Sequence, residues 1–297
     1  MALQFDDPMQ SVFADWPLQA QALGLSNQPT AGLVAPIPTR VEIAPAPDGT
    51  NAYRCTIDPN DTPTYSGIRA HVAYMRETAH NNGGAAERWY RWEMYFPADF
   101  DAVDMLSVCQ VHDTPDGGEG SVKFPNFEVM VQGEDIWIWT PLAAPTEGQT
   151  PRYPTGRRAK VIRGRWVTIA IHSNWSKLSD GFLEVYFDNE LMVREWNRPC
   201  SYDDAIAPYW IIGMYDWEHK GTSLAHQYRV WYRNAKVYNT GHTAQEVLGA
   251  EPKLPPRRVA WQMIPSIESS SPPSGEWSLD FSSPDNSGYQ SLRSIGV

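Results

Sequence analysis

The sequence predicts an all-β protein, either a β-sandwich or a jelly roll. Short runs that alternate apolar and polar residues, or that are rich in aromatic and β-branched residues, recur along the main body. Gly, Pro, Asn and Asp separate these runs. No long segment has the periodicity of an amphipathic helix. These observations favour a fold that is built from sheets.

Eight runs have the clearest strand patterns. Two turns and one short helix can also be predicted from local sequence signals. The turn at 132–135 lies between two runs, and the turn at 188–190 leads into a further short run, so both predict β-hairpins. One short helix is predicted at 243–248, where Thr243 and Glu246 fit a capping box. The predicted strands cover 68–74, 89–96, 106–112, 127–131, 136–140, 166–172, 182–187 and 209–215.

Composition limits the classes of function. The chain has 297 residues, of which 42% are hydrophobic and 20% charged, so it has enough apolar material for a packed core. Its net charge of −11 argues against nucleic acid as a partner. No apolar run approaches the roughly 20 residues that cross a bilayer, so no membrane partner is predicted. The three cysteines are too few and too scattered for a disulfide framework or a zinc site.

The composition changes near residue 250 and predicts two parts. Residues 1–250 form the β domain, and residues 251–297 are a Pro/Ser-rich extension. Within it, we expect 251–275 to be an extended linker and 276–297 a polar appendage that docks on a partner. The alternative is a tail that packs along the edge of the domain. Residues 1–8 lack the basic and apolar regions of a secretory signal.

Several common hydrolase motifs are missing from the sequence. Sandwich glucanases carry closely spaced acidic residues on one strand, and the nearest cluster here, Glu184, Asp188 and Glu190, straddles a turn where charge is usually solvated. A Gly-x-Ser-x-Gly elbow, a Gly-rich phosphate loop and a His-Glu-x-x-His helix are also absent. Chemistry therefore has to come from polar residues on the strands.

Uncommon polar side chains occupy alternate positions of the predicted strands. In 106–112, the two-residue period puts Gln110 and His112 on one face, and Cys109 and Val111 on the other. An ordinary exposed strand face is the alternative explanation. By the same alternation, the outward positions of the other strands are Arg69, His71, Asn126, Glu128, Trp137, Trp139, Thr168, Ala170, His172, Gly213 and Tyr215.

Two kinds of outward position indicate contact with another group. Trp137 and Trp139 are spaced like a flat platform for sugar rings, although packing at a sheet edge explains them equally well. Gly213 gives room for something to approach its strand closely.

An amide, imidazoles, a guanidinium and a phenol on one sheet face suit elimination from a uronic acid. The proton next to the carboxylate is too weakly acidic to be removed unless the carboxylate charge is neutralised, which Gln and Arg donors can do. A His or Tyr can take the proton, and a Tyr hydroxyl can protonate the departing oxygen. This chemistry requires no metal or organic cofactor, so none is predicted.

The order and spacing of six segments resemble the heparin lyase I-like superfamily, which overlaps in pattern with alginate lyases of polysaccharide lyase family 7 and with glucuronan lyases. The resemblance implies a β-jelly roll, a concanavalin A-like sandwich of two curved antiparallel sheets with a concave groove for an acidic polysaccharide. Alginate lyases carry Arg-x-Glu-Leu where this chain has Arg69-Ala-His-Val, and Lys at the position of Ile211. The segments are 68–72, 88–100, 110–112, 164–175, 181–189 and 209–215.

The resemblance also implies roles for individual residues. Gln110, helped by Arg69, would neutralise the substrate carboxylate. His112 would be the base or a second carboxylate ligand, and Tyr215 the general acid, or acid and base both. His172 is a competing base. The predicted substrate-binding residues are His71, Arg91, Lys123, Asn126, Trp137, Trp139, His172 and Lys220.

Two functions therefore stand side by side. One is a polysaccharide lyase that cleaves a 4-linked uronic-acid-containing polymer by β-elimination. The other is a non-catalytic carbohydrate-binding or structural jelly roll, for instance on a phage particle. Either function would place the protein outside the cell or on a virion.

Overall fold

The computed structural model describes residues 3–6, 18–22, 40–61, 67–74, 86–101, 103–112, 125–141, 152–202, 208–216 and 226–254. The chain divides into two compact units, Met1–Lys253 and Leu254–Val297. Most of the predicted linker and all of the predicted appendage lie outside the described residues. The first unit contains the described strands and one short helix.

The first of two sheets has eight strands, and every pairing in it is antiparallel. β1 pairs with β15 beside the main path of the sheet. The order along that path is β13 (Glu190–Trp196), β12 (Phe182–Phe187), β11 (Trp166–Trp175), β6 (Ala86–Tyr95), β15 (Tyr228–Tyr238), β4 (Asn51–Ile57) and β3 (Val41–Pro45), with β1 at Leu3–Asp6.

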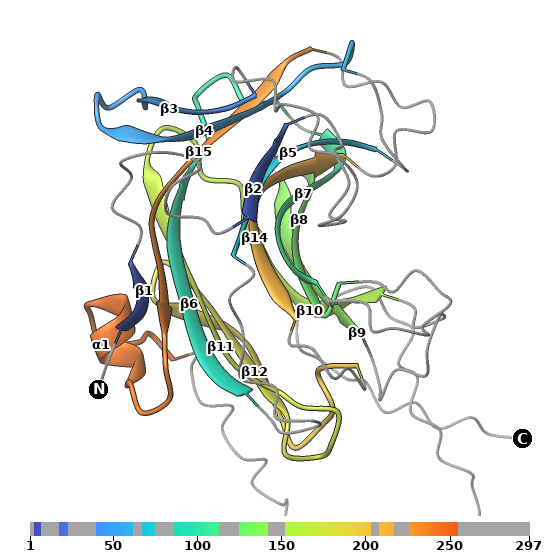
Figure 1. Ribbon diagram of the computed structural model, residues 1–297, viewed down its shortest axis with the longest axis vertical. Coiled ribbons are helices and arrows are strands. Elements are labelled where there is room, and N and C mark those ends of the chain that lie inside the picture. The colour runs from blue at the N-terminus through green and yellow to red at the C-terminus, as the bar shows by residue number, and fades with distance from the viewer. Residues whose placement is uncertain are drawn as a thin grey trace, which may run out of the picture. The chain divides into compact units, whose positions relative to one another are not determined.

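The second sheet has seven strands, also antiparallel, and it packs against the first (Figure 1). Its ribbon curves so that its hollow side faces away from the eight-stranded sheet. Two curved antiparallel sheets in one sandwich are the predicted β-jelly roll, so the fold class is confirmed. The strand order is β10 (Arg152–Lys160), β9 (Asp135–Pro141), β8 (Phe127–Gly133), β7 (Val103–His112), β14 (Tyr209–Asp216), β5 (Ile68–Tyr74) and β2 (Leu18–Ala22).

The core lies between the two sheets and is built from alternate residues of each strand. Trp210 of β14 meets Trp92 and Tyr90 of β6, with ring centres 5.5 and 5.4 Å apart. Ile212 and Met214 continue the same face of β14, as alternation predicts. Burying one large apolar side chain of this kind contributes about 1.5–3 kcal/mol. Residues between these core positions therefore face away from the core.

Local signals fix the predicted turns and the helix. Asp188 and Asn189 both have positive φ, 50° and 65°, which suits the tight hairpin between β12 and β13. Thr243 and Glu246 form the predicted capping box of helix α1 (Ala244–Leu248). α1, the only helix in the described part of the chain, has five residues, too few to span a bilayer.

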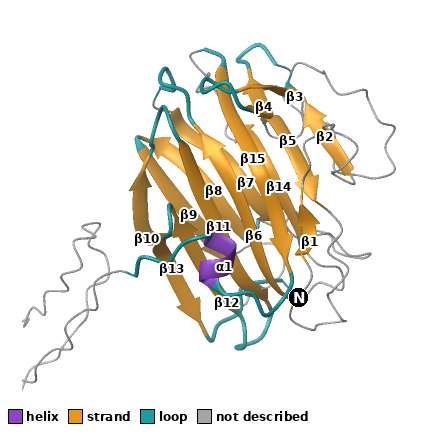
Figure 2. Ribbon diagram, turned by 90° about the vertical axis from the view of Figure 1, so that its left-hand side faces the viewer, coloured by secondary structure: helices purple, strands orange, loops and turns teal. Residues whose placement is uncertain are grey.

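Helix α1 covers part of the outer face of the eight-stranded sheet (Figure 2). Its Val247 and Leu248 pack with Trp89, Ala170 and Tyr186 in a small second core. Ala170 is therefore buried, although its place in the alternation of 166–172 predicted exposure. The alternation identified the correct face but not the helix that covers it.

Candidate active site

The outer, hollow face of the seven-stranded sheet carries most of the predicted site residues. We call it the site face. Strand register fixes which residues share it, because directly paired residues of antiparallel strands point to the same side. β14 lies in the middle, between β5 and β7. Along β14, Tyr209 pairs with His112, Ile211 with Gln110, Gly213 with His71, and Tyr215 with both Arg69 and Ser107.

Arg69 and Tyr215 form the closest contact on this face. The guanidinium carbon of Arg69 lies 4.1 Å from the centre of the Tyr215 ring. A cation over an aromatic ring is attracted by its negative face, which holds the two side chains together. Both are half-buried. The pair therefore puts a positive charge and a phenol side by side at the surface of the sheet.

His71 is buried beside this pair and has no hydrogen-bond partner among the residues that the structure describes. The residue is 1% exposed, and neither ring nitrogen forms a hydrogen bond to a described residue. Burial, and then the charges of Arg69 and His112, lower the pKa of His71 to about 3. The ring is therefore neutral at ordinary pH, with one nitrogen able to donate a hydrogen bond and the other able to accept one.

Gly213 explains why His71 lies so close to β14. A Cβ at Gly213 would lie 2.4 Å from the Cα of His71 and 2.5 Å from the carbonyl oxygen of Ala70. Its φ of 131° is also strained for any other residue. The close approach that the sequence predicts at Gly213 is thus made by the backbone of β5.

Gln110 is held by a carboxylate on the next strand. Its Nε2 donates to Oε1 of Glu128 at 2.5 Å, and the two residues are directly paired between β7 and β8. Gln110 is 4% exposed and Glu128 0%. The contact fixes the orientation of the carboxamide, because only its nitrogen end can donate to a carboxylate. One N–H is used in this way, and the second donates to no other described residue.

The predicted exposure of Glu128 and Asn126 is corrected by the structure, which buries both completely. Gln110 and Trp139 flank Glu128 on the neighbouring strands. Asn126 donates from Nδ2 to the hydroxyl of Ser201 at 2.9 Å. Alternation assigns a residue to a face, but the neighbours on that face decide whether water reaches it.

His112 shares the site face but lies at its far end from Tyr215. Its ring stacks on Tyr209, with centres 5.6 Å apart. Tyr215 is six positions after Tyr209 along β14, a span of about 20 Å at the usual strand rise. Gln110 pairs with Ile211, which is four positions before Tyr215 on β14, or about 13 Å on the same scale. His71 lies in the row between them.

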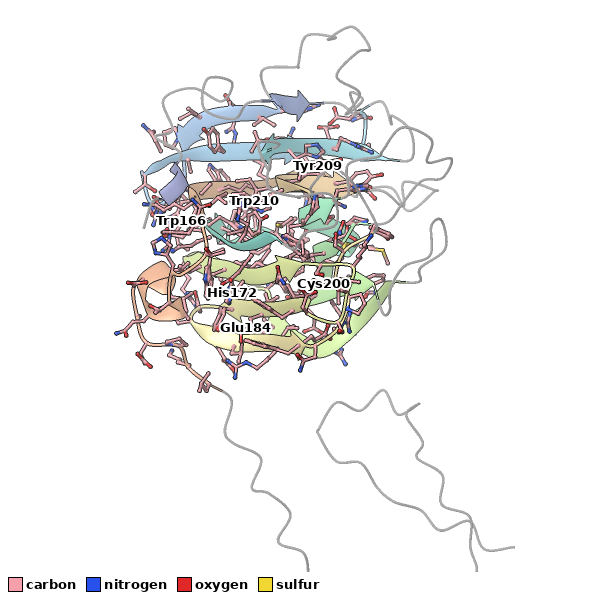
Figure 3. All side chains as sticks on the ribbon, turned by 60° about the horizontal axis from the view of Figure 1, so that its bottom comes forward. Trp166, His172, Glu184, Cys200, Tyr209 and Trp210 are labelled. Atoms are coloured by element: carbon pink, nitrogen blue, oxygen red, sulfur yellow. The ribbon has the colours of Figure 1, made fainter. Side chains whose placement is uncertain are left out.

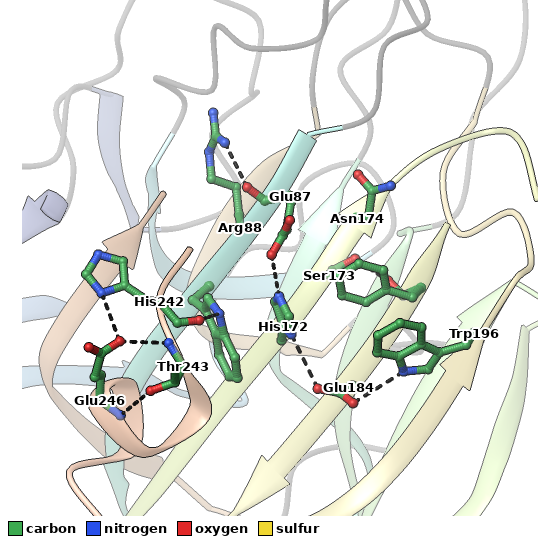
Figure 4. Close-up of polar contacts among 12 residues, drawn as sticks. Glu87, Arg88, His172, Ser173, Asn174, Glu184, Trp196, His242, Thr243 and Glu246 are labelled. Atoms are coloured by element: carbon green, nitrogen blue, oxygen red, sulfur yellow. Dashed lines mark hydrogen bonds and ion pairs between the residues drawn. The ribbon is translucent and has the colours of Figure 1, made fainter. Parts of the chain in front are cut away.

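Two predicted site residues belong to the other sheet. His172 lies on the outer face of β11, with Nε2 2.9 Å from Glu87 and Nδ1 3.3 Å from Glu184 (Figures 3 and 4). Its ring is stacked on Trp89, with centres 4.0 Å apart. The core separates it from the site face, which corrects the expectation that it competes with His112 as the base. The alternation could not tell which sheet β11 joins.

Arg91 needs the same correction. It lies on β6, two residues from Trp89 and on the same outer face of the eight-stranded sheet. Its guanidinium donates to Glu93 at 3.0 Å, and Glu93 also accepts from Arg233 at 2.7 Å. Arg91 therefore pairs with Glu93 on the outer face of the eight-stranded sheet and does not reach the site face. Lys123 and Lys220, the remaining predicted cations, lie outside the described residues.

The edge of the site face beyond Glu128 is aromatic and charged. Trp137 and Trp139 of β9 both lie on this face and are half-buried. The guanidinium carbon of Arg158 on β10 lies 4.3 Å from the centre of the Trp137 ring. Among the described residues, no three His, Cys, Asp or Glu side chains gather to hold a metal.

Sequence reasoning did not assign Glu128 and Arg158 to the site. The alternation of 127–131 places Glu128 on the correct face, but it does not reveal the partner on β7. Arg158 lies in a strand that was not predicted, because Pro154 and Gly156 interrupt its pattern. Pairing with β9 is what places Arg158 on the site face.

Comparison with known proteins agrees with the fold. A family model described as polysaccharide lyase matches residues 27–236. No match was found among curated proteins. An endo-β-1,4-glucuronan lyase from the fungus Trichoderma reesei is 22% identical, with a TM-score of 0.54 over 70% of this chain and 88% of that chain.

Two alginate lyases are also similar. One is a member of polysaccharide lyase family 7, at 14% identity, a TM-score of 0.49 and coverage of 67% and 84% of the two chains. The other, from Pseudomonas aeruginosa, has 15% identity, a TM-score of 0.46 and coverage of 66% and 85%. The family match extends over most of the sandwich, including the strands that carry Arg69, Gln110 and Tyr215. The chain is therefore a jelly-roll enzyme that belongs to the polysaccharide lyase family.

Proposed function

We propose that this lyase cleaves a 4-linked uronic-acid-containing polysaccharide by β-elimination on the site face. The observation that carries the proposal is the register of β5, β14 and β7, which brings the phenol of Tyr215, the guanidinium of Arg69, the neutral imidazole of His71 and the carboxamide of Gln110 to one side of one sheet. These are the groups that the reaction needs, namely hydrogen-bond donors for a carboxylate and a proton carrier.

The donors act on the substrate carboxylate. Gln110 and His71 flank the strand β14 from either side, and neighbouring strands are about 4.8 Å apart. A carboxylate over Ile211 and Gly213 would accept from the free N–H of Gln110 and from the N–H of His71. Arg69 supplies positive charge beside Tyr215, two positions farther along β14 than Gly213. Charge on the carboxylate grows as the proton leaves, so fixed donors stabilise the intermediate more than the substrate.

Tyr215 handles the protons. A base removes the proton at the carbon next to the carboxylate, and that electron pair forms a carbon–carbon double bond. The bond to the 4-linked oxygen breaks, and this oxygen takes a proton. Tyr215 lies next to Arg69 and is accessible, so we assign it the transfer to the leaving oxygen. We assign the base to Tyr215 as well, with His112, which is farther along β7, as the second candidate.

Glu128 orients Gln110 for this task. Without an acceptor on β8, the carboxamide could turn its oxygen toward the substrate carboxylate, and two acceptors would then face each other. The bond at 2.5 Å prevents this orientation. A carboxylate without exposure is costly unless it is paired, and in enzymes such groups gather at functional sites.

The test is product analysis on paired polymers. The protein is incubated with glucuronan, with alginate, and with the same polymers after reduction of their carboxyl groups to alcohols. We expect unsaturated uronate ends, detected by ultraviolet absorbance and mass spectrometry, from at least one native polymer and from neither reduced polymer. New reducing ends without unsaturation would mean hydrolysis, and binding without any cleavage would mean a carbohydrate-binding protein. Either result would overturn the proposal.

A further inference from the structure

The far edge of the site face holds a cation that the reaction as proposed does not use. Arg158 on β10 is paired with Trp137 on β9 and stacks on its ring at 4.3 Å. The neighbouring residues Ile136 and Ala159 face the core, which confirms that the stacked pair faces outward. Stacking holds the planar guanidinium in one orientation while leaving its N–H groups at the surface.

The hydrogen-bonding capacity of Arg158 is largely free. Its closest acid is Asp135, at 3.6 Å, which is beyond a direct hydrogen bond. Asp135 forms this longer ion pair with Arg158 and a shorter one, at 2.5 Å, with Lys160. The Arg158 side chain is 37% exposed, and its guanidinium donates no hydrogen bond to a described residue. A rigid, exposed guanidinium with free donors is suited to a carboxylate, which it can bind through two parallel hydrogen bonds.

Strand register also gives the distance from the reacting groups. One row of paired residues crosses the sheet from Tyr215 through Ser107 and Met130 to Trp137 and Arg158. Ser107 and Met130 are buried and uncharged. At about 4.8 Å per strand, Trp137 lies about 14 Å from Tyr215. A 1,4-linked sugar chain advances by about one strand spacing per residue, so this distance corresponds to about three sugars.

We propose that Arg158, positioned by Trp137, binds the carboxylate of a uronate about three residues away from the cleaved bond. The ligand class is a run of consecutive uronates, so the enzyme should prefer polyuronate blocks over polymers with isolated uronates. This inference rests on the proposed function, because it takes Tyr215 as the reacting end of the row.

The test compares oligouronates of increasing length. Arg158→Gln removes the charge and keeps much of the side-chain volume, and Arg158→Lys keeps the charge without the fork. For oligomers long enough to reach β10, we expect KM to rise about five- to tenfold in Arg158→Gln with kcat unchanged, and Arg158→Lys to recover only part of the loss. Dimers and trimers should be cleaved as by the parent. Arg165→Gln is the matched control, because Arg165 is an exposed arginine paired with Asp188 on the other sheet.

Two results separate this inference from the proposed function. If Arg158→Gln shows the parent's KM at every length, the distal subsite is wrong and the lyase assignment stands. If the parent makes no unsaturated product, the proposed function is wrong, and calorimetric titration of the parent and Arg158→Gln with a long oligouronate decides the subsite. Equal affinities would overturn it, and a five- to tenfold loss would support it.

Discussion

The outer faces of the two sheets carry the same kinds of polar residue but use them differently. On the eight-stranded sheet, both nitrogens of His172 lie near carboxylates and its ring is stacked on Trp89. On the seven-stranded sheet, His71 is buried with neither nitrogen paired among the described residues. A histidine whose groups are all satisfied within the protein stabilises it, whereas a histidine with unused groups is available to a ligand.

The carboxylates differ in the same way. Glu184 accepts from Tyr186 and Arg194. It also accepts from Trp196 and contacts His172 (Figure 4). Burial alone would raise the pKa of Glu184, but the hydrogen bonds from His172 and Tyr186 and the charge of Arg194 outweigh burial and hold it at about 2. Glu128 is more deeply buried and receives the amide of Gln110, a residue with a proposed role in the reaction. The first cluster is a structural network, whereas we propose that the second orients a reacting group.

The largest expected effect separates two tyrosines. Tyr215→Phe removes one hydroxyl from the site face, so turnover should fall by about 10²–10⁴, the usual contribution of a positioned acid or base. Tyr186→Phe removes the hydroxyl that donates to Glu184 at 2.9 Å, so it should cost about 1 kcal/mol of stability and leave turnover unchanged. Initial rates and urea unfolding measure both. Equal rates for Tyr215→Phe and the parent would remove Tyr215 from the mechanism.

A smaller effect is expected for the pair on β7 and β8. Gln110→Ala should lower kcat by about 10²–10³ through lost stabilisation of the intermediate. Glu128→Leu should lower it by about tenfold to a hundredfold, and Glu128→Gln should keep most of the activity because its oxygen can still accept from Gln110.

The double variant decides whether Glu128 acts through Gln110. In the Gln110→Ala background, Glu128→Leu should cause little further loss of kcat, since residues that act as a unit are not additive. Independent, multiplicative losses would show that Glu128 has another role.

The two histidines provide the next comparison. His71→Gln should lower kcat by about tenfold or more with a small change in stability, because no bond to a described residue is lost. His172→Gln should lose about 1–3 kcal/mol of stability and keep the parent's kcat, because its carboxylate contacts and its stacking are weakened. The reverse pattern would indicate that the active site lies on the eight-stranded sheet and would contradict the proposal.

The smallest effect is a difference in pH dependence. His71 has a folded-state pKa of about 3 against an ordinary value of 6.5, so only the unfolded chain takes up this proton between those values. Stability should therefore fall as pH falls through this window, by at most about 1.4 kcal/mol per pH unit from this group. As the pH falls from about 6.5 to about 5, the stability of His71→Gln should decrease by about 1.6 kcal/mol less than that of the parent. If the stabilities of the parent and His71→Gln changed equally with pH, the His71 ring would not be buried and neutral as described.

Much of the fold follows from local pattern, whereas the site depends on pairing between distant strands. The alternation of apolar and polar residues was sufficient to place Gln110 and Tyr215 on the faces of their strands that point away from the core. It could not assign His172 to a sheet, because β11 pairs with β6 and β12, and only these partners place it away from β14.

The strand β15 shows the other limit of pattern reasoning. It carries Arg229, Arg233 and Lys236, and a register shift between Arg233 and Lys236 accompanies the positive φ of Asn234. A bulge of this kind breaks the two-residue period, so the segment does not read as one strand.

The most direct test of the account is to map where an oligouronate binds. Amide NMR shifts of the Tyr215→Phe protein, which should bind without turnover, are followed as the oligomer is added. We expect the largest changes in β5, β7 and β14, around His71, Gln110 and residue 215, and changes within error in β11 and β12 around His172 and Glu184. Shifts concentrated on β11 and β12 would contradict the central claim that the site face is the catalytic face.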